Sequence, residues 1–158
     1  MNITIRRAKE EDIKGCASTL ENSTLAEAYF RTEDSRINSV KEAIDSGNTY
    51  AAFCGDECVG FIYVIEQGAF HAFHYVHLIA VKDSYRRQGI GKKLLEFVED
   101  ILFETRDKIF LVVGDYNPGG RLFYEKLGYI CVGTIPGLYR DGINEDIMMK
   151  VRGSNKDT

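Results

Sequence analysis

Residues 86–93 read RRQGIGKK, and this stretch decides how the rest of the chain is interpreted. It follows a short apolar run, Leu78–Val81, that has the composition of a buried strand. From Gly89 onward apolar residues recur every three to four positions, as in a helix with one buried face: Ile90, Leu94, Phe97, Val98, Ile101 and Leu102. The stretch is therefore predicted to be the turn between a strand and a strongly amphipathic helix.

The composition of this turn is suited to a phosphate group. Gly89 and Gly91 allow a ligand to approach the main chain closely, because neither carries a side chain. The start of a helix also offers N–H groups without partners and the positive end of the helix dipole. The basic side chains of the stretch add positive charge: Arg86, Arg87, Lys92 and Lys93. We therefore predict a site for phosphate or pyrophosphate at this turn.

Two common phosphate-binding loops do not match the stretch. A Walker loop has a glycine five residues before the glycine of its Gly-Lys pair, where this chain has Arg86, and Ser or Thr after the lysine, where it has Lys93. A dinucleotide-binding turn requires a third glycine at the position of Leu94. Both loops are excluded.

Outward from this turn, hydrophobic periodicity divides the chain into short strands and amphipathic helices. Helices are predicted at about 10–20, at Glu33–Asp45, from Gly89 onward, and from the Asn117-Pro118 cap to Gly128. Strands are predicted at Ile3–Ile5, Tyr50–Cys54, Cys58–Ile65, Phe73–Lys82, Lys108–Gly114, Tyr129–Gly133 and Glu145–Val151. Tyr29 and Phe30 fall in a predicted loop, as does Gln67–Ala69. This order predicts one mixed α/β domain over residues 1–152, followed by a polar tail at 153–158.

Size and charge narrow the class of protein. The chain has 158 residues, 44% of them hydrophobic and 28% charged, which is typical of one globular domain. Its net charge of −4 gives no broad basic face for nucleic acid. Apolar runs such as Ile109–Val113 are too short to span a membrane, and the polar start lacks the apolar stretch of a signal peptide. We expect a soluble cytoplasmic protein that binds neither nucleic acid nor a membrane.

The cysteines and histidines suggest a metal site only at first sight. Cysteines stand at positions 16, 54, 58 and 131, and the cytoplasm keeps such thiols reduced. Cys54 and Cys58 precede three histidines, all of which are acceptable zinc ligands. However, the two cysteines flank a predicted hairpin turn, and strand alternation sends His74 and His77 to opposite faces. We expect neither a disulfide nor a bound metal.

The 86–93 turn resembles the pyrophosphate loop of the GNAT superfamily of N-acetyltransferases, which reads Gln or Arg, two residues, Gly, one residue, then Gly or Ala. Arg86, Gly89 and Gly91 fill its fixed positions. A second segment, NPGGRLFYEKLGY at 117–129, is similar to the closing helix of the same superfamily. The close likeness covers about residues 75–133. It implies a GNAT-like fold, with a central mixed, largely antiparallel sheet of about seven strands flanked by about four helices.

The resemblance implies acetyl-CoA as co-substrate and no metal. Arg86 is expected to belong to the cofactor site, and the amides that follow it would hold the pyrophosphate: Arg87, Gln88, Gly89, Ile90, Gly91 and Lys92. The strand backbone at Ile79, Ala80 and Val81 would pair with the pantetheine. Asn117 would contact the pantetheine as well as cap its own helix.

Two residues are predicted to move protons. Acetyl transfer needs a neutral amine, whereas an unperturbed lysine-like amine has a pKa of ~10.4 and is mostly protonated at neutral pH. His77, on the same face of its strand as Tyr75, titrates in the right range to be the base. The carboxylates that remain as alternatives are Glu66, Asp141, Glu145 and Asp146. Tyr124 stands where the superfamily has the general acid that protonates the CoA thiolate.

The acceptor is expected to be a primary amine on a small or amino-acid-like molecule. Ribosomal-protein alanine N-acetyltransferases, which share much of this pattern, carry a glutamate base five residues before the motif asparagine, where this chain has Val112. The aromatic residues predicted to bind the acceptor are Tyr29, Phe30, Tyr75 and Tyr139. Two other functions stay open: acetylation of protein N-termini or lysines, and acyl-CoA sensing without catalysis. Whether the protein forms a homodimer is also left open by the sequence.

Overall fold

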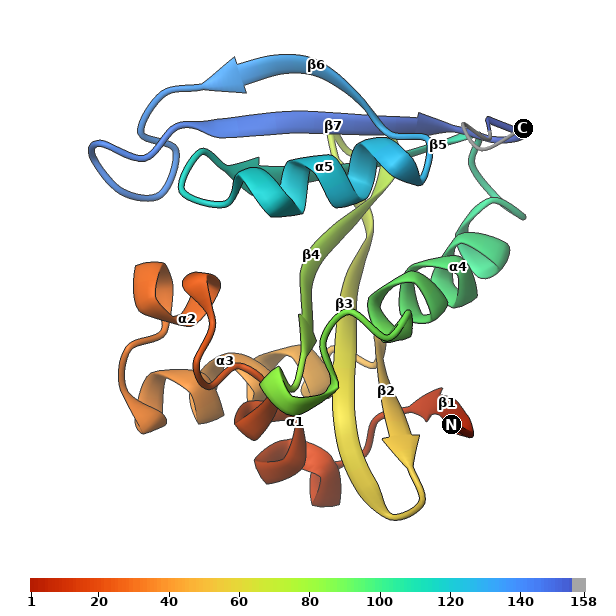
Figure 1. Ribbon diagram of the computed structural model, residues 1–158. Helices are drawn as coiled ribbons and strands as arrows, with labels where there is room; N and C mark the ends of the chain where they lie inside the picture. The colour runs from red at the N-terminus through yellow and green to blue at the C-terminus, as the bar shows by residue number, and fades with distance from the viewer. Residues whose placement is uncertain (155–158) are drawn as a thin grey trace. The chain divides into compact units, whose positions relative to one another are not determined.

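The computed structural model describes residues 1–154 (Figure 1). Seven strands form one hydrogen-bonded sheet in the order β1-β2-β3-β4-β5-β7-β6. The strands are β1 (Ile3–Arg7), β2 (Thr49–Cys54), β3 (Glu57–Ala69), β4 (Phe73–Val81), β5 (Lys108–Gly114), β6 (Ile130–Ile135) and β7 (Glu145–Val151). β4 and β5 pair in parallel, whereas β1 with β2, β2 with β3, β5 with β7, and β6 with β7 pair antiparallel. The predicted mixed, largely antiparallel sheet is confirmed.

Five α-helices lie within the described residues: α1 (Ile13–Thr19), α2 (Thr24–Tyr29), α3 (Glu33–Asp45), α4 (Ile90–Leu102) and α5 (Pro118–Lys126). Short 3₁₀ turns precede α1 and α4, at Glu10–Asp12 and Asp83–Tyr85. The predicted loop position of Tyr29 is wrong, because Tyr29 is the last residue of α2 and Phe30 follows it. The Ser23 side chain accepts a hydrogen bond from the N–H of Ala26 at 3.0 Å. This cap starts a helix that is too short for hydrophobic periodicity to reveal.

The predicted loop at Gln67–Ala69 is also wrong, because β3 continues to Ala69. Gln67, Phe70 and His71 have positive φ values of 54°, 59° and 57°, so the chain turns with unusual backbone geometry here. The Gln67 N–H donates to Nδ1 of His74 at 3.2 Å. A side-chain acceptor from the next strand therefore holds Gln67 in place, and local sequence does not show such a contact.

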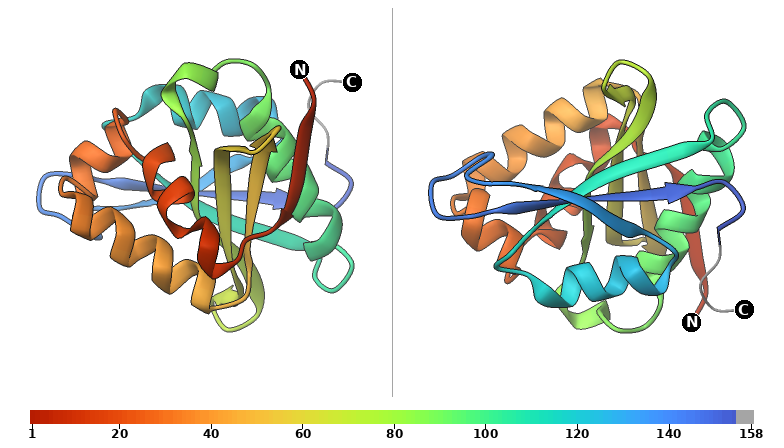
Figure 2. Two further views of the ribbon diagram at one scale, coloured as in Figure 1. Left: turned by 90° about the horizontal axis from the view of Figure 1, so that it is seen from below. Right: turned by 90° about the horizontal axis from the view of Figure 1, so that it is seen from above.

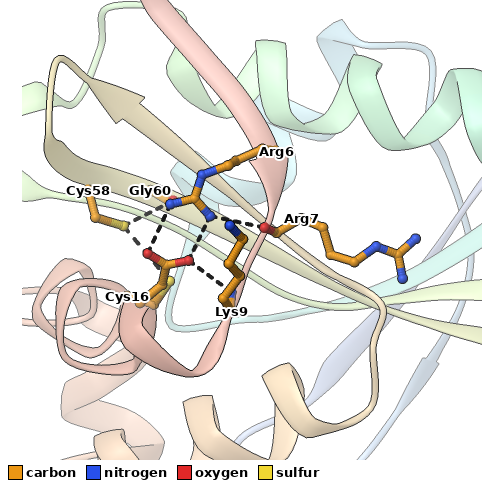
Figure 3. A network of polar contacts seen from close by, with 7 residues as sticks. Arg6, Arg7, Lys9, Cys16, Cys58 and Gly60 are labelled. Carbon is orange, nitrogen blue, oxygen red and sulfur yellow. Dashed lines mark hydrogen bonds and ion pairs between the residues drawn. The ribbon is translucent and has the colours of Figure 1, made fainter.

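By its contacts the chain divides into two compact units, Met1–Ile65 with His77–Val98, and Glu66–Val76 with the chain from Glu99 onward. In the first unit, α1 packs closely on β3 (Figure 3). A Cβ at Gly15 would lie 2.9 Å from Cβ of Cys58, so only glycine permits this approach. The Sγ atoms of Cys16 and Cys58 lie 3.8 Å apart, and both thiols are buried. Beside them, the guanidinium of Arg6 forms an ion pair with Asp12 at 2.8 Å.

The second unit is built on the antiparallel strands β5, β7 and β6, which lie side by side in the right-hand view of Figure 2. A buried polar network stabilises it. The Tyr129 hydroxyl donates to Oε2 of Glu99 at 2.7 Å, and Nζ of Lys150 lies 3.1 Å from Oε1 of the same carboxylate. Tyr129 is 1% exposed, so this carboxylate is both paired and hydrogen-bonded away from water.

Among residues 1–154 no helix combines the length and apolar character that crossing a membrane requires. All four cysteines are free thiols. The boundary at residue 152 stays a prediction, and most of the predicted tail, residues 155–158, lies outside the described residues.

Candidate active site

The 86–93 turn has a backbone suited to an anion. Gly89 has a φ of 83° and Arg87 a φ of 61°, which is uncommon for a residue with a side chain. A Cβ at Gly89 would meet no atom within 4 Å, so the space above this backbone is open. Residues 87–89 are exposed, and α4 begins at Ile90. The first N–H groups of a helix have no acceptor within it, so this turn presents exposed donors to a ligand.

Arg86 fixes the turn in position instead of offering its charge to a ligand. Its Nε donates to the carbonyl of Val81 at 2.9 Å. Its Nη1 and Nη2 donate to the carbonyls of Asn22 at 2.8 Å and Glu21 at 3.3 Å. Asn22 in turn donates from Nδ2 to Asp83 at 3.0 Å. Sequence reasoning missed Glu21 and Asn22, because no local signal connects them to a residue more than sixty positions later.

The predicted cofactor strand is the half-buried end of β4, Ile79–Val81. β3 runs close beside it at Gly60, where a Cβ would lie 2.8 Å from the carbonyl oxygen of Ala80. The N–H of Lys82 donates to the carbonyl of Val59 at 2.8 Å. The glycine therefore allows two strands to approach closely just before the 86–93 turn.

His77 lies on β4 with its side chain exposed, and its ring makes an edge contact with Tyr63 on β3, with centroids 5.5 Å apart. Desolvation by the surrounding protein lowers the pKa of His77, and the nearby charge of Glu42 offsets part of this shift. The imidazole is therefore neutral at physiological pH, as a proton acceptor must be.

Asn117 and Tyr124 both belong to α5. The Asn117 Oδ1 accepts a hydrogen bond from the N–H of Gly120 at 3.0 Å, which confirms the predicted cap. Tyr124 is 9% exposed, and its ring contacts the ring of Tyr129 with centroids 5.8 Å apart. Burial raises the pKa of Tyr124, so the phenol keeps its proton at neutral pH.

Of the four aromatic residues predicted to bind the acceptor, the structure brings two together. The hydroxyls of Tyr75 on β4 and Tyr139 in the β6–β7 loop lie 3.3 Å apart. Burial and this hydrogen bond raise the pKa of Tyr75. In the other unit, Tyr29 ends α2, and the adjacent Phe30 lines a cavity of about 650 Å³ with residues of the α1–α3 segment.

The four carboxylates kept as alternative bases lie in different environments. Glu66 and Asp141 are exposed. Asp146 is paired with Arg121 of α5 at 2.9 Å and accepts from Thr134 at 2.7 Å. Glu145, its neighbour in sequence, is 3% exposed and lies at the start of β7.

The cysteines and histidines considered for zinc do not form a site. Within residues 1–154 no group of three or more His, Cys, Asp or Glu side chains is arranged to hold a metal ion. His74 is buried and its Nε2 lies 2.7 Å from Oγ1 of Thr105, whereas His77 is exposed. The two histidines thus occupy the opposite faces that strand alternation predicts.

The mixed, largely antiparallel sheet and the turn with exposed backbone at the start of α4 agree with the fold and the loop that the GNAT resemblance implies. The family model described as "Acetyltransferase (GNAT) family" matches residues 12–129. The chain belongs to this acetyltransferase family.

Three similar proteins illustrate the range of the family. The catalytic subunit NAA20 of the N-terminal acetyltransferase B complex of Arabidopsis thaliana is 36% identical over 97 residues, which cover 57% of this chain and 55% of that protein. An aminoglycoside 6′-N-acetyltransferase complexed with coenzyme A superposes with a TM-score of 0.78 at 23% identity, covering 99% of this chain and 100% of that one. The PaiA N-acetyltransferase of Thermoplasma acidophilum, in complex with coenzyme A, gives a TM-score of 0.70 at 23% identity, covering 96% and 99%. The chain spans 28% to 57% of the length of the curated relatives it matches, and the structural likenesses show a shared fold.

Proposed function

We propose that this protein transfers the acetyl group of acetyl-CoA directly to the primary amine of a small-molecule or amino-acid-like acceptor. The single observation that carries the proposal is the backbone of the 86–93 turn. Its exposed amides, the positive φ of Arg87 and the open space above Gly89 fit the pyrophosphate of a CoA ester. When bound, acetyl-CoA supplies the activated acetyl group.

The residues proposed to hold acetyl-CoA come from the turn and from the strand before it. Amides of Arg87 to Lys92 bind the pyrophosphate, and Arg86 keeps the turn in place through its three carbonyl partners. The backbone of Ile79, Ala80 and Val81 pairs with the pantetheine, and the amide near Val81 polarises the thioester carbonyl. Asn117 contacts the pantetheine while it caps α5.

Two side chains are proposed to transfer protons. His77 accepts a proton from the acceptor ammonium, which frees the nitrogen lone pair for attack on the thioester carbonyl. The C–N bond then forms, the C–S bond breaks, and the nitrogen releases its second proton to solvent as it becomes the amide nitrogen, while solvent later returns a proton to Tyr124. Tyr124 donates a proton to the departing thiolate, and its raised pKa supports this role because the phenol is protonated beforehand. Direct attack by the amine requires no acyl-cysteine intermediate.

The acceptor is proposed to bind beside aromatic side chains. Tyr75 and Tyr139 form one pair in the second unit, and Tyr29 and Phe30 lie next to each other in the first. A second candidate function is acetylation of protein N-termini or lysines, and the 36% identity with an N-terminal acetyltransferase subunit favours it.

The test is a panel of small amines and amino acids run beside a panel of peptides with free N-termini and lysines. Acetylated products are identified by mass spectrometry, because the protein's own thiols would add to a thiol-release signal. Acetylation of small amines supports the proposal, and acetylation of peptides alone supports the second candidate. Calorimetric binding of acetyl-CoA without turnover on either panel would instead indicate an acyl-CoA sensor.

Cytoplasmic localisation, a single domain over residues 1–152 and the lack of nucleic-acid or membrane partners are proposed with this function. A homodimer stays an open prediction, to be decided by sedimentation of the full chain.

A further inference from the structure

The strand registers of the second unit gather one set of side chains on one face of the sheet. Tyr75 on β4 is directly opposite Phe110 on β5. Along β5, alternation places Val112 and Gly114 on the same face as Phe110, and Gly114 is directly opposite Glu145 on β7. Because directly opposed residues share a face, Glu145 and Tyr75 project from the same side of the sheet.

Glu145 occupies space that β5 leaves empty. A Cβ at Gly114 would lie 2.6 Å from Oε2 of Glu145 and would also collide with the ring of Tyr116. Any side chain at position 114 would therefore displace the carboxylate. Val112, on the same face, has no group that accepts a proton or binds a cation, so the carboxylate at this end of β5 comes from Glu145 of β7.

The surroundings of Glu145 are aromatic, and the nearby phenol of Tyr75 has a raised pKa. Burial, the hydrogen bond to Tyr139 and the charge of Glu145 all raise the pKa of Tyr75. Tyr139, at 50% exposure, opens the pair to solvent, whereas Glu145 is only 3% exposed. A carboxylate shielded from bulk water, beside aromatic rings, attracts an organic ammonium more strongly than an exposed carboxylate does.

The neighbouring carboxylate has a different role. Asp146 is opposite Val113 and therefore projects from the other face, where Arg121 of α5 and Thr134 hold it. Asp146 thus connects α5 to β7, whereas Glu145 lies on the face of the sheet that also carries Tyr75.

We propose that Glu145 is the anionic group that binds the ammonium of the acceptor, beside the rings of Tyr75 and Tyr139. The acceptor is thereby an amine that arrives in its cationic form. This inference rests on the acetyltransferase function proposed above and adds the residue that selects its substrate by charge.

The test compares Glu145→Gln with Asp146→Asn, a matched control that removes the same charge one residue away on the other face. The probes are choline and its uncharged isostere 3,3-dimethyl-1-butanol, used as inhibitors of acetylation of the best amine in the panel. We expect choline to inhibit the unmodified protein about tenfold more strongly than the isostere, and Glu145→Gln to remove this difference. The same variant should raise KM for the amine about tenfold and leave KM for acetyl-CoA within twofold.

Asp146→Asn should lower the melting temperature but keep the choline preference, because the contacts it weakens, with Arg121 of α5 and with Thr134, lie on the other face. Glu145→Asp, which retains the charge, should also keep the preference, and it covers the case in which Glu145→Gln fails to fold. The inference is overturned if an active protein binds choline no better than the isostere, or if Glu145→Gln weakens both probes equally. The absence of amine acetylation by the unmodified protein would instead refute the proposed function.

Discussion

A Tyr124→Phe variant should lose catalytic rate while it keeps its stability and its affinity for acetyl-CoA. General acid catalysis contributes roughly 10²- to 10⁴-fold to rate. Burial raises the pKa of Tyr124, so the phenol is a weaker acid than usual, and CoA thiolate, whose thiol has a pKa near ~8.5, already leaves without much help. We therefore expect a loss at the lower end, about 10² in kcat, which corresponds to about 2.7 kcal/mol in the activation barrier.

The stability of the variant follows from the surroundings of the side chain. Burial is the cause of the raised Tyr124 pKa, and the ring contact with Tyr129 survives in phenylalanine. The free energy of unfolding should therefore change by at most about 0.5 kcal/mol, which moves the melting temperature by no more than about 2 °C.

Tyr129→Phe is the matched control, because Tyr129 is the ring neighbour of Tyr124. Its hydroxyl donates to the buried carboxylate of Glu99 at 2.7 Å. Loss of this charge-assisted hydrogen bond should cost about 1.5–3 kcal/mol, or roughly 3–12 °C in melting temperature, with kcat unchanged.

The assay measures kcat at saturating acetyl-CoA and amine, the melting temperature by circular dichroism, and the dissociation constant of acetyl-CoA by calorimetry. The two variants should show opposite patterns, with Tyr124→Phe losing rate alone and Tyr129→Phe losing stability alone. Full kcat in Tyr124→Phe together with lowered stability would refute the acid assignment.

Three further substitutions test other parts of the molecule. Gly91→Asp should abolish acetyl-CoA binding in calorimetry, because a carboxylate would stand where anionic phosphate meets the start of α4; unchanged affinity in a folded variant would remove the phosphate turn from the mechanism. If His77 is the base, kcat/KM should rise with pH through an apparent pKa below the ordinary ~6.5, since desolvation lowers the pKa of His77, and His77→Gln should eliminate this rise; an unaltered pH profile would assign the proton to another group. Desolvation pushes the pKa of Asp12 up, but hydrogen bonds from Arg6 and from the backbone outweigh it and leave this pKa below its usual value. The stability that this carboxylate supplies is therefore present above pH ~4 and lost as pH falls through its lowered pKa. Asp12→Asn should lower the free energy of unfolding in urea by roughly 1–3 kcal/mol at neutral pH and by little at pH ~2. An equal loss at both pH values would contradict the pairing of Asp12 with Arg6.

Hydrophobic periodicity, helix caps and turn residues in the sequence correctly predicted several helices and strands. The amphipathic period located α4, and the Asn117-Pro118 cap located the start of α5. β5 and β7 have the predicted bounds, Lys108–Gly114 and Glu145–Val151, because turn residues end both apolar runs. The signal failed at α2, where a single serine cap sets a short helix that has too few residues to show a period.

The candidate site required contacts that no local pattern contains. The basic turn indicated phosphate, but the role of Arg86 depends on carbonyls of Glu21 and Asn22, and these belong to the segment after α1. The arginine was expected to add charge to the turn, whereas its hydrogen bonds direct the guanidinium to the backbone. Only the fold distinguishes a ligand-facing guanidinium from one that fixes a turn.

The two acidic residues at the start of β7 show the same limit more sharply. Alternation alone states that Glu145 and Asp146 face opposite sides of a sheet, yet it does not say which side holds α5. The register with β5 decides this, because Gly114 is opposite Glu145 and leaves room for a carboxylate, while Asp146 meets Arg121 of α5 on the other side. A one-residue shift of this register would exchange the two roles and place the anchor of α5 on the Tyr75 face. The pairing of β5 with β7 therefore determines which of the two carboxylates lies at the proposed acceptor site. Asp146→Asn is the control for this reason: it removes an equal charge from the same strand without removing the carboxylate on the side of Tyr75.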